Sequence, residues 1–264
     1  MLILAIETAT QSVGIALANE QGVVAHLEVR QGRRHAETVV PAVEQLLAHA
    51  EASMADITRI AVDVGPGLFT GLRVGVATAK AYALALDVTI VAISSLELVA
   101  YEAASLVLAR LEAVRAVPFN SPPDPIAATS TFTVHAELLG DLLAPTFPTM
   151  RFGVVIDARR KELYAAVFEA SLVVGQIICT QIIPTFVAKP LDVREAFSAS
   201  GVSILAGDGA LVYLGAFEEF VLLPGSPRAS VLSERALLVE GISADEIELD
   251  YVRAPDAEIN WVTR

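Results

Sequence analysis

The sequence is 264 residues long and carries 31 acidic against 18 basic side chains, a formal net charge of −13. Apolar residues make up 54% of it and charged residues 19%, which is enough apolar material for a core and excludes the disordered class. The acidic excess also argues against a protein that binds nucleic acid on its own, because such binding depends on Lys and Arg neutralising phosphates.

Three short apolar runs open the chain and predict an antiparallel meander. They cover residues 2–6, 13–18 and 23–29, with turn residues at 19–22. Apolar side chains at helical spacing then predict a helix over 36–50, in which Pro41 either starts the regular part or introduces a kink.

Two further strands and two helices complete this unit. Residues 57–64 and 88–93 have the pattern of buried strands, and helices are predicted over 70–86 and 96–115. Thr70 is the expected N-cap of the first of these helices, and Ser94 or Ser95 that of the second. Residues 1–115 are therefore expected to form an N-terminal α/β lobe.

Prolines concentrate in the next segment, 116–150. Six of the thirteen in the chain lie there, namely Pro118, Pro122, Pro123, Pro125, Pro145 and Pro148. This composition predicts a loop or an insertion, with a short helix at 135–143.

A second three-strand pattern follows at 152–156, 162–168 and 173–183. A helix over 190–199, a strand over 202–205, a turn at 207–209 and a helix over 229–240 come after it. Each half thus begins with a meander whose first strand ends near an acidic residue, Glu7 or Asp157. We expect a structural duplication, with residues 151–264 as a C-terminal lobe.

Two such halves suggest the actin-like ATPase fold, in which a nucleotide lies between the lobes. That chemistry needs a carboxylate near the first strand for a metal, and hairpin N–H groups for phosphates. Glu7 and Asp157 stand where such carboxylates would be, but the first hairpin, 8–12, contains no glycine. A lone acid after a strand is more often a turn residue than a metal ligand. A small-molecule kinase or ATPase using Glu7 and Asp157 remains one hypothesis.

The most specific stretch is Gly65-Pro66-Gly67-Leu68-Phe69-Thr70-Gly71-Leu72-Arg73-Val74-Gly75, at a strand-to-helix junction. It is not a P-loop, because no Lys follows its last glycines. Gly71, Gly75 and Ala79 recur every four residues and predict a helix stripe almost without side chains. Two interpretations stand: a helix N-terminus that binds an anion, or, as we favour, a stripe that packs against a helix of a partner chain.

Other signals of chemistry are weak. The four histidines form no HxxxH or HExxH pair, so no strong metal site is predicted. The basic clusters Arg33-Arg34 and Arg159-Arg160-Lys161 are short, and such clusters are usually solvated surface. The single cysteine, Cys179, permits no internal disulfide. With no secretory signal and no convincing membrane span, we expect a soluble, cytoplasmic protein.

Several motifs together resemble the TsaB (YeaZ) family. They are Arg34-His35-Ala36-Glu37 with Pro41, the glycine-rich stretch 65–75, Ala79-Lys80-Ala81, Ser94-Ser95-Leu96-Glu97, Asp157-Ala158-Arg159-Arg160 with Glu162 and Tyr164, and Tyr251-Val252-Arg253-Ala254-Pro255. Leu68 departs from the pattern, since the family usually has Ser there.

The resemblance implies an α/β, actin-like (ribonuclease H-like) fold of two βββαβα lobes. It also implies a non-catalytic subunit that binds and activates TsaD in the synthesis of tRNA threonylcarbamoyladenosine, together with the small ATPase TsaE. The catalytic subunit holds a metal through paired histidines, and the corresponding stretch here, 94–101, contains none. A metallopeptidase, an old label of the wider family, is disfavoured for the same reason.

The resemblance further implies that the first two helices of the N-terminal lobe contact TsaD, or a second copy of this chain when it is alone. No cofactor is expected on this chain by itself, although ATP or ADP is compatible with the interface of the complex, and tRNA is expected to be reached only through the complex. The residues expected at the interface are Arg34, His35, Gly65, Pro66, Gly67, Phe69, Thr70, Gly71, Arg73, Gly75 and Ala79.

Overall fold

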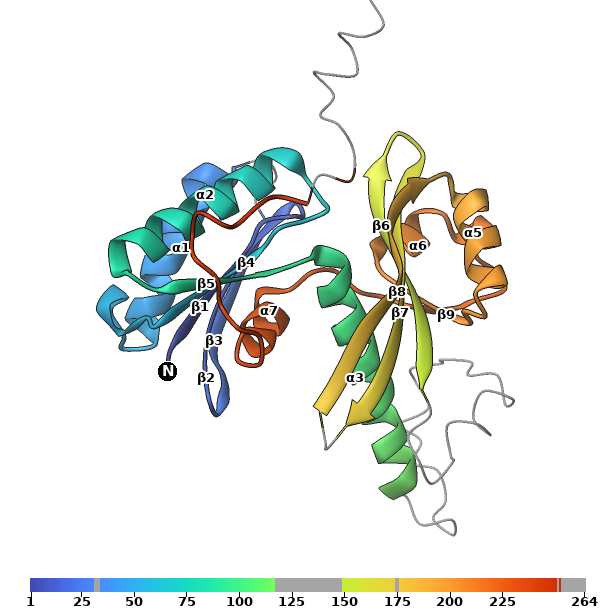
Figure 1. Cartoon of the computed structure of the whole chain (residues 1–264), viewed down its shortest axis with the longest axis horizontal. Coiled ribbons are helices and arrows are strands. Elements are labelled where there is room, and N and C mark those ends of the chain that lie inside the picture. Colours follow the sequence, from blue (N-terminus) through green and yellow to red (C-terminus); the bar gives the residue numbers. More distant parts are fainter. Residues whose placement is uncertain (31–33, 117–148, 174–175, 251, 253–264) are drawn as a thin grey trace, which may run out of the picture.

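Two five-stranded sheets form two lobes that lie side by side (Figure 1). The computed structural model describes residues 1–30, 34–116, 149–173, 176–250 and 252, with side chains described for all of these except 110–116. Most of the loop or insertion predicted at 116–150, namely residues 117–148 with the helix predicted at 135–143, lies outside these residues.

The first sheet has the strand order β3-β2-β1-β4-β5. Its strands are β1 (Ile3–Glu7), β2 (Ser12–Asn19), β3 (Gly22–Arg30), β4 (Arg59–Asp63) and β5 (Thr89–Ile93). β1 to β3 form the predicted antiparallel meander, and β4 and β5 continue the sheet in parallel with β1. Because β1 and β4 are parallel and in register, their last residues, Glu7 and Asp63, end at the same edge of the sheet.

The second sheet repeats this order, read as β8-β7-β6-β9-β10. Its strands are β6 (Met150–Arg159), β7 (Glu162–Val173), β8 (Gln176–Ala188), β9 (Ile204–Ala206) and β10 (Val221–Leu223). β6 to β8 are again antiparallel neighbours, and β9 and β10 are parallel to β6. The duplication expected from the sequence is confirmed, although β10, only three residues long, was too short to give a sequence pattern.

Five predicted helices are present among the described residues, four with small changes of boundary, whereas the one predicted over 229–240 ends at Arg235. They are α1 (His35–His49), α2 (Phe69–Leu86), α3 (Ser95–Ala116), α5 (Pro190–Ala199) and α7 (Ala229–Arg235), with the short 3-10 turns η1 (Met54–Asp56) and η3 (Leu214–Ala216). The expected turn at 207–209 instead leads into a five-residue helix, α6 (Asp208–Val212). Pro41 lies inside α1 rather than at its start.

The two expected helix caps differ in outcome. Ser94 Oγ accepts a hydrogen bond of 3.1 Å from the Glu97 N–H, so it caps α3 as predicted. The cap predicted at Thr70 is wrong, because α2 begins one residue before it and its N-cap is Leu68, which has no capping side-chain bond.

The two lobes exchange one helix each. Leu96 and Val99 of α3 lie in a core with Phe152 of β6, so this helix packs on the second sheet. Leu232 of α7 packs with Ile3 of β1, so this helix covers the first sheet. The predicted division at 115 therefore needs correction, because α3 belongs by packing to the second lobe and α7 to the first.

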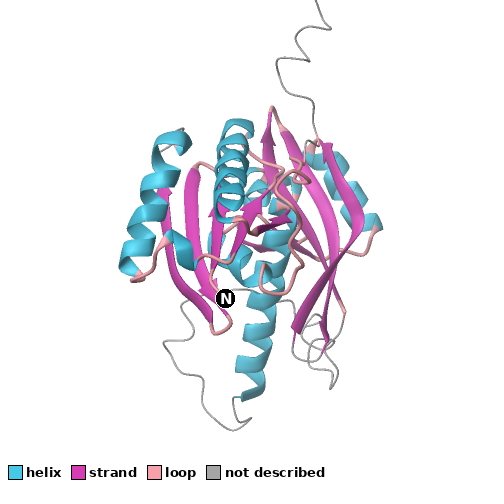
Figure 2. Ribbon diagram, turned by 60° about the vertical axis from the view of Figure 1, so that its left-hand side comes forward, coloured by secondary structure: helices cyan, strands magenta, loops and turns pink. Residues whose placement is uncertain are grey.

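Helices cover both faces of each sheet (Figure 2). α1 and α2 bury the other face of the first sheet, where Val43 and Leu46 meet Ile6 and Ile15. α5 does the same for the second sheet, with Phe197 in a core of its own. No helix among the described residues is long and apolar enough to cross a membrane.

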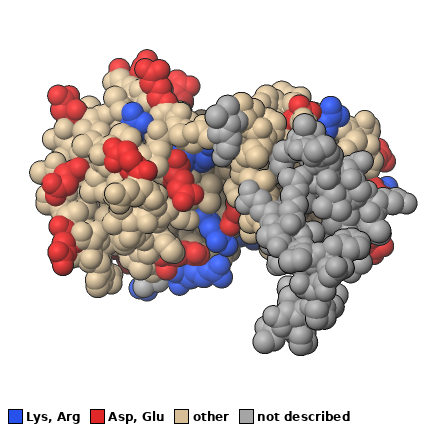
Figure 3. All heavy atoms as spheres, turned by 90° about the horizontal axis from the view of Figure 1, so that it is seen from below, with Lys and Arg blue, Asp and Glu red and all other residues tan. Residues whose placement is uncertain are grey.

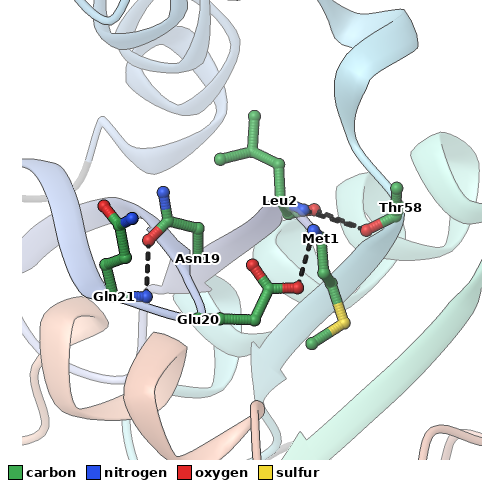
Figure 4. Close-up of polar contacts among 6 residues, drawn as sticks. All are labelled: Met1, Leu2, Asn19, Glu20, Gln21 and Thr58. Carbon is green, nitrogen blue, oxygen red and sulfur yellow. Dashed lines mark hydrogen bonds and ion pairs between the residues drawn. The ribbon is translucent and has the colours of Figure 1, made fainter.

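The start of β1 is fastened to two neighbouring elements (Figure 4). The Met1 amino group pairs with Glu20 at 2.7 Å, and the Leu2 N–H donates to Thr58 Oγ1 at 3.0 Å. Asn19 Oδ1 accepts from the Gln21 N–H at 2.8 Å, which closes the β2–β3 turn. These contacts fix β1 between β2 and β4, and so fix where Glu7 comes to lie.

Candidate functional site

The glycine-rich stretch connects β4 to α2 and lies against the turn between β1 and β2. Gly65 has a φ of +103°, a conformation that favours glycine, and precedes a cis peptide bond to Pro66. A Cβ on Gly67 would lie 2.7 Å from that of Ala9, and the Leu68 N–H donates to the Ala9 carbonyl at 2.7 Å. These glycines therefore allow backbone to approach backbone within the chain.

The stripe of small residues on α2 also faces inward. Gly71, Gly75 and Ala79 are buried, and a Cβ at Gly71 or Gly75 would collide with Thr8, at its carbonyl oxygen or its Oγ1. His35 covers the same place, with Nε2 2.9 Å from the Thr10 carbonyl. The expectation that this stripe is open to a partner chain is therefore wrong, because the chain's own first turn occupies it.

The other expected interface residues divide by exposure. His35, Gly65 and Pro66 are buried, whereas Gly67 and Phe69 are half-buried. Arg34, Thr70 and Arg73 are exposed, and the Arg73 guanidinium lies 4.0 Å from the centre of the Phe69 ring.

The outward side of α2 carries a second stripe, which we call the α2 outer face. It consists of Arg73, Ala77, Lys80 and Leu84, at the spacing that places residues on one side of a helix. Leu84 is 73% exposed, unusual for so large an apolar side chain. Residues 247–249 run beside this face and enclose with it a groove of about 430 Å³. A leucine on the polar side of a helix was the sequence signal that could have found this face.

Two carboxyl groups are buried side by side at the edge of the first sheet. Glu7 Oε1 accepts from the Ala9 N–H at 2.6 Å, and Asp63 Oδ1 accepts from the Gly65 N–H at 2.8 Å and from Ser95 Oγ at 2.7 Å. Burial raises the pKa of Asp63 to about 7. Burial, and then the neighbouring Asp63, raise the pKa of Glu7 well above its usual range.

A cleft of about 490 Å³ lies between the lobes, and Glu7 and Asp157 both line it. The structure therefore brings together the two carboxylates that the sequence singled out. Both already have partners within the chain: Glu7 the Ala9 N–H, and Asp157 the Arg159 guanidinium at 3.2 Å. Asp208 also lines the cleft, and burial raises its pKa.

The turn between β6 and β7 has an unusual backbone. Arg159, Arg160 and Lys161 have φ values of 63°, 54° and 63°. Because Arg159 pairs with Glu162, the two central turn residues are Arg160 and Lys161, and a turn with two positive φ values normally contains Asn-Gly. A left-handed conformation costs a residue other than glycine about 1 kcal/mol or more. The mismatch between residue type and backbone conformation distinguishes Arg159, Arg160 and Lys161 from ordinary charged residues on the surface.

Charge is distributed unevenly over the surface. Figure 3 shows acidic side chains scattered over the first lobe, while basic ones gather largely between the lobes. Among the described residues, no group of three or more His, Cys, Asp and Glu is arranged to hold a metal ion.

Known proteins resemble this chain over its full length. Residues 11–110 match the family model described as TsaD, tRNA N6-adenosine threonylcarbamoyltransferase. The chain is 42% identical over 271 residues to the tRNA threonylcarbamoyladenosine biosynthesis protein TsaB of Bacillus subtilis, covering 99% of this chain and 98% of that protein. It is 37% identical over 118 residues to TsaB of Escherichia coli, covering 43% of this chain and 51% of that protein.

Solved structures agree with the fold. YeaZ from Pseudomonas aeruginosa has a TM-score of 0.63 at 23% identity, covering 93% of this chain and 96% of that one. A protein described as similar to peptidase YeaZ, from the same organism, has a TM-score of 0.67 at 24% identity, covering 96% and 99%. The predicted α/β, actin-like fold of two lobes is confirmed.

Proposed function

Because the chain belongs to the TsaB family of tRNA threonylcarbamoyladenosine biosynthesis proteins, we propose that it is the non-catalytic subunit that binds and activates a TsaD-type enzyme. The observation that carries this proposal is the α2 outer face, in which Arg73, Ala77 and Leu84 are exposed and Lys80 is half-buried, with a groove beside it in the lobe expected to contact the enzyme.

The chemistry of the groove indicates what docks there. Arg73 and Lys80 lie two helical turns apart and outnumber the one acidic residue of the groove, Glu248. The groove has apolar walls, formed by Val76, Ala77, Ile247 and Leu249. Such a surface fits a helix that carries apolar side chains flanked by carboxylates. Leu84 extends the apolar part of the contact by a further turn of α2.

The state of the cleft supports a subunit without catalysis of its own. A carboxyl group with a raised pKa holds its proton more strongly, and a protonated carboxyl is a poor ligand for Mg²⁺. Glu7 is such a group, and it is 2% exposed. Asp157, the other carboxylate of the cleft, is already paired with the Arg159 guanidinium of the same chain.

The rest of the assembly follows from the same proposal. A TsaE-type ATPase joins the complex, and ATP or ADP binds at an interface of the assembled complex instead of on this chain alone. Two copies pair through the α2 outer face when the enzyme is absent. Because tRNA is the substrate, the complex works in the cytoplasm.

Reconstitution tests the proposal. Purified TsaD-type and TsaE-type subunits and the enzyme that makes the threonylcarbamoyl adenylate are incubated with tRNA, and the modified nucleoside is measured with and without this chain. We expect little product without the chain and at least tenfold more with it. Equal amounts of product in the two reactions would contradict the proposal.

The alternative is a small-molecule kinase or ATPase of the same fold. The observation that favours it is the cleft itself, which is lined by Glu7, Asp157 and Asp208. ATP turnover by the purified chain alone, lost in Glu7→Gln and unchanged in Arg73→Gln, would establish this alternative. We expect no turnover above background in either variant or in the wild type.

A further inference from the structure

The turn between β6 and β7 has no part in the proposed docking of the enzyme. It lies in the second lobe, at the upper end of the β6–β7 hairpin in Figure 1, whereas the α2 outer face belongs to the first lobe. Arg159, Arg160 and Lys161 are all exposed. Arg159 is paired with Asp157 at 3.2 Å, so the positive charge at the tip of this hairpin rests mainly on Arg160 and Lys161, in a chain of net charge −13.

The residue types at this turn conflict with its geometry. Arg160 and Lys161 occupy the two positions where Asn and Gly would be the more stable choice. Where a sequence violates a local rule, a functional role is the usual reason. The backbone conformation favours Asn and Gly at these two positions. We therefore attribute the presence of Arg160 and Lys161 to the charge of their side chains.

The base of the turn is held in place. Asp157 Oδ1 accepts from the Arg159 N–H at 2.9 Å, and the Asp157 N–H donates to Asp208 Oδ1 at 3.3 Å. These bonds tie the turn to α6, so that little further ordering of the backbone is needed when a ligand binds.

The position of the three cations indicates the size of the ligand. Arg159 lines the cleft between the lobes, as does Arg30 from the first lobe, but Arg160 and Lys161 are not among its lining residues. A small anion inside the cleft would meet Arg159 and miss the other two. A ligand that meets all three has to extend across the rim, as a chain of phosphates does.

We propose that the turn Arg159–Lys161 binds the phosphate backbone of RNA directly. This inference rests on the proposed function, which supplies tRNA as the RNA, and it revises the expectation that tRNA is reached only through the partner subunit. The turn contributes a few phosphate contacts to a complex whose main affinity for tRNA comes from elsewhere.

The test uses the double variant Arg160→Asn/Lys161→Gly in the full chain. It removes two charges while installing the residues that the turn geometry prefers, so we expect an unchanged or higher melting temperature. Binding of a fluorescent tRNA transcript to the complex with the TsaD-type subunit is measured by anisotropy between about 50 and about 200 mM salt. We expect affinity to fall about tenfold at low salt, and the log–log salt slope to become shallower by about 1.5.

Arg151→Gln/Arg194→Gln is the matched control, because it removes two charges from β6 and α5, away from the turn. It should leave tRNA affinity and the salt slope near their wild-type values. Equal losses in both double variants would overturn the proposal in favour of a net-charge effect. An unchanged affinity in the turn variant would overturn it as well.

A second measurement separates this inference from the proposed function. In the reconstituted reaction the turn variant should raise the KM for tRNA and leave kcat near wild type. A reaction that needs the chain but shows an unchanged KM for tRNA in the variant overturns only the RNA contact. A reaction that proceeds equally well without the chain overturns the proposed function.

Discussion

The first turns of the two lobes occupy the same place in the duplicated topology but have opposite surroundings. The turn after β1 is covered at its start, with Thr8 fully buried beneath Gly71 and Gly75, and reaches the cleft at Thr10 and Gln11. The turn after β6 is exposed and carries three cations. The difference lies in the helix that follows the fourth strand of each sheet: α2 has 18 residues, and α6 has five.

A repeated fold therefore does not repeat its chemistry. In the first lobe the long helix covers the turn and presents its outer face to solvent. In the second lobe the short helix leaves Arg159, Arg160 and Lys161 exposed to solvent. Substitutions in these two environments, or in the contacts that join the lobes, test this comparison.

The largest effect is expected where α2 meets the first turn. Gly75→Leu places a side chain where Thr8 Oγ1 lies, and should destabilise the fold by about 3 kcal/mol or more, because the Thr8 side chain is fully buried and has no space into which to move. Ala77→Leu, on the exposed side of the same helix, should change stability by less than about 0.5 kcal/mol. Thermal unfolding followed by circular dichroism compares the two.

A stripe that packed against a partner chain, as favoured from the sequence, would instead leave the Gly75→Leu monomer folded and block only the partner. If Gly75→Leu unfolds at the wild-type temperature, α2 does not pack on Thr8 as described.

The buried carboxyl pair makes stability depend on pH. The pKa of Asp63 is about 7 in the folded chain against 3.8 when exposed, so the folded state keeps a proton that the unfolded state releases. The stability from this group is complete below about pH 4 and is lost as the pH rises through 7. Asp63→Asn keeps an acceptor for the Gly65 N–H and cannot ionise, so it should gain stability relative to wild type as the pH rises from 4 to 8.

Urea unfolding at several pH values measures this difference. Asp192→Asn, at an exposed position on α5, is the control and should follow the wild-type curve at every pH. Parallel curves for wild type and Asp63→Asn would contradict the assignment of the proton to this pair.

The smallest effect is expected where the two lobes are joined. Tyr101 on α3 accepts a hydrogen bond of 2.7 Å from Arg235 of α7, and its ring lies 3.5 Å from that guanidinium. Tyr101→Phe keeps the ring and removes the hydroxyl, which also accepts a longer bond of 3.4 Å from the Cys179 N–H, so it should cost about 1 kcal/mol of stability. Tyr213→Phe is the matched control, because Tyr213 is half-buried just after α6 within the second lobe, and it should cost about half of that or less. Equal costs in chemical denaturation would remove Tyr101 as a link between the lobes.

Much of the fold was predictable because periodicity is a local property. The two meanders, the strands β4 and β5, and the helices α1, α2, α3 and α5 follow from runs of apolar residues. The exchange of α3 and α7 between the lobes was not predictable, since an apolar helix face does not state which sheet it covers.

The site shows the same division. The residue type of Gly71 and Gly75 already indicates close packing against a neighbour. The tertiary structure decides whether that neighbour is a partner chain or Thr8. Asp63 went unnoticed because a single acid after a strand is common, and its pairing with Glu7 depends on strand order. Leu84 also went unnoticed, although its place in the helical pattern, on the same side of α2 as Arg73 and Lys80, could have shown that it is exposed.

The central claim is that the α2 outer face activates the enzyme while the cleft does no chemistry. The most direct test measures the rate of tRNA modification in the reconstituted system as the concentration of this chain is raised. For Arg73→Glu/Lys80→Glu we expect half-maximal stimulation to need at least tenfold more protein, and for Glu7→Gln we expect the wild-type curve. A wild-type curve for the α2 variant, or full loss of stimulation in Glu7→Gln while it still binds the enzyme, would contradict the account.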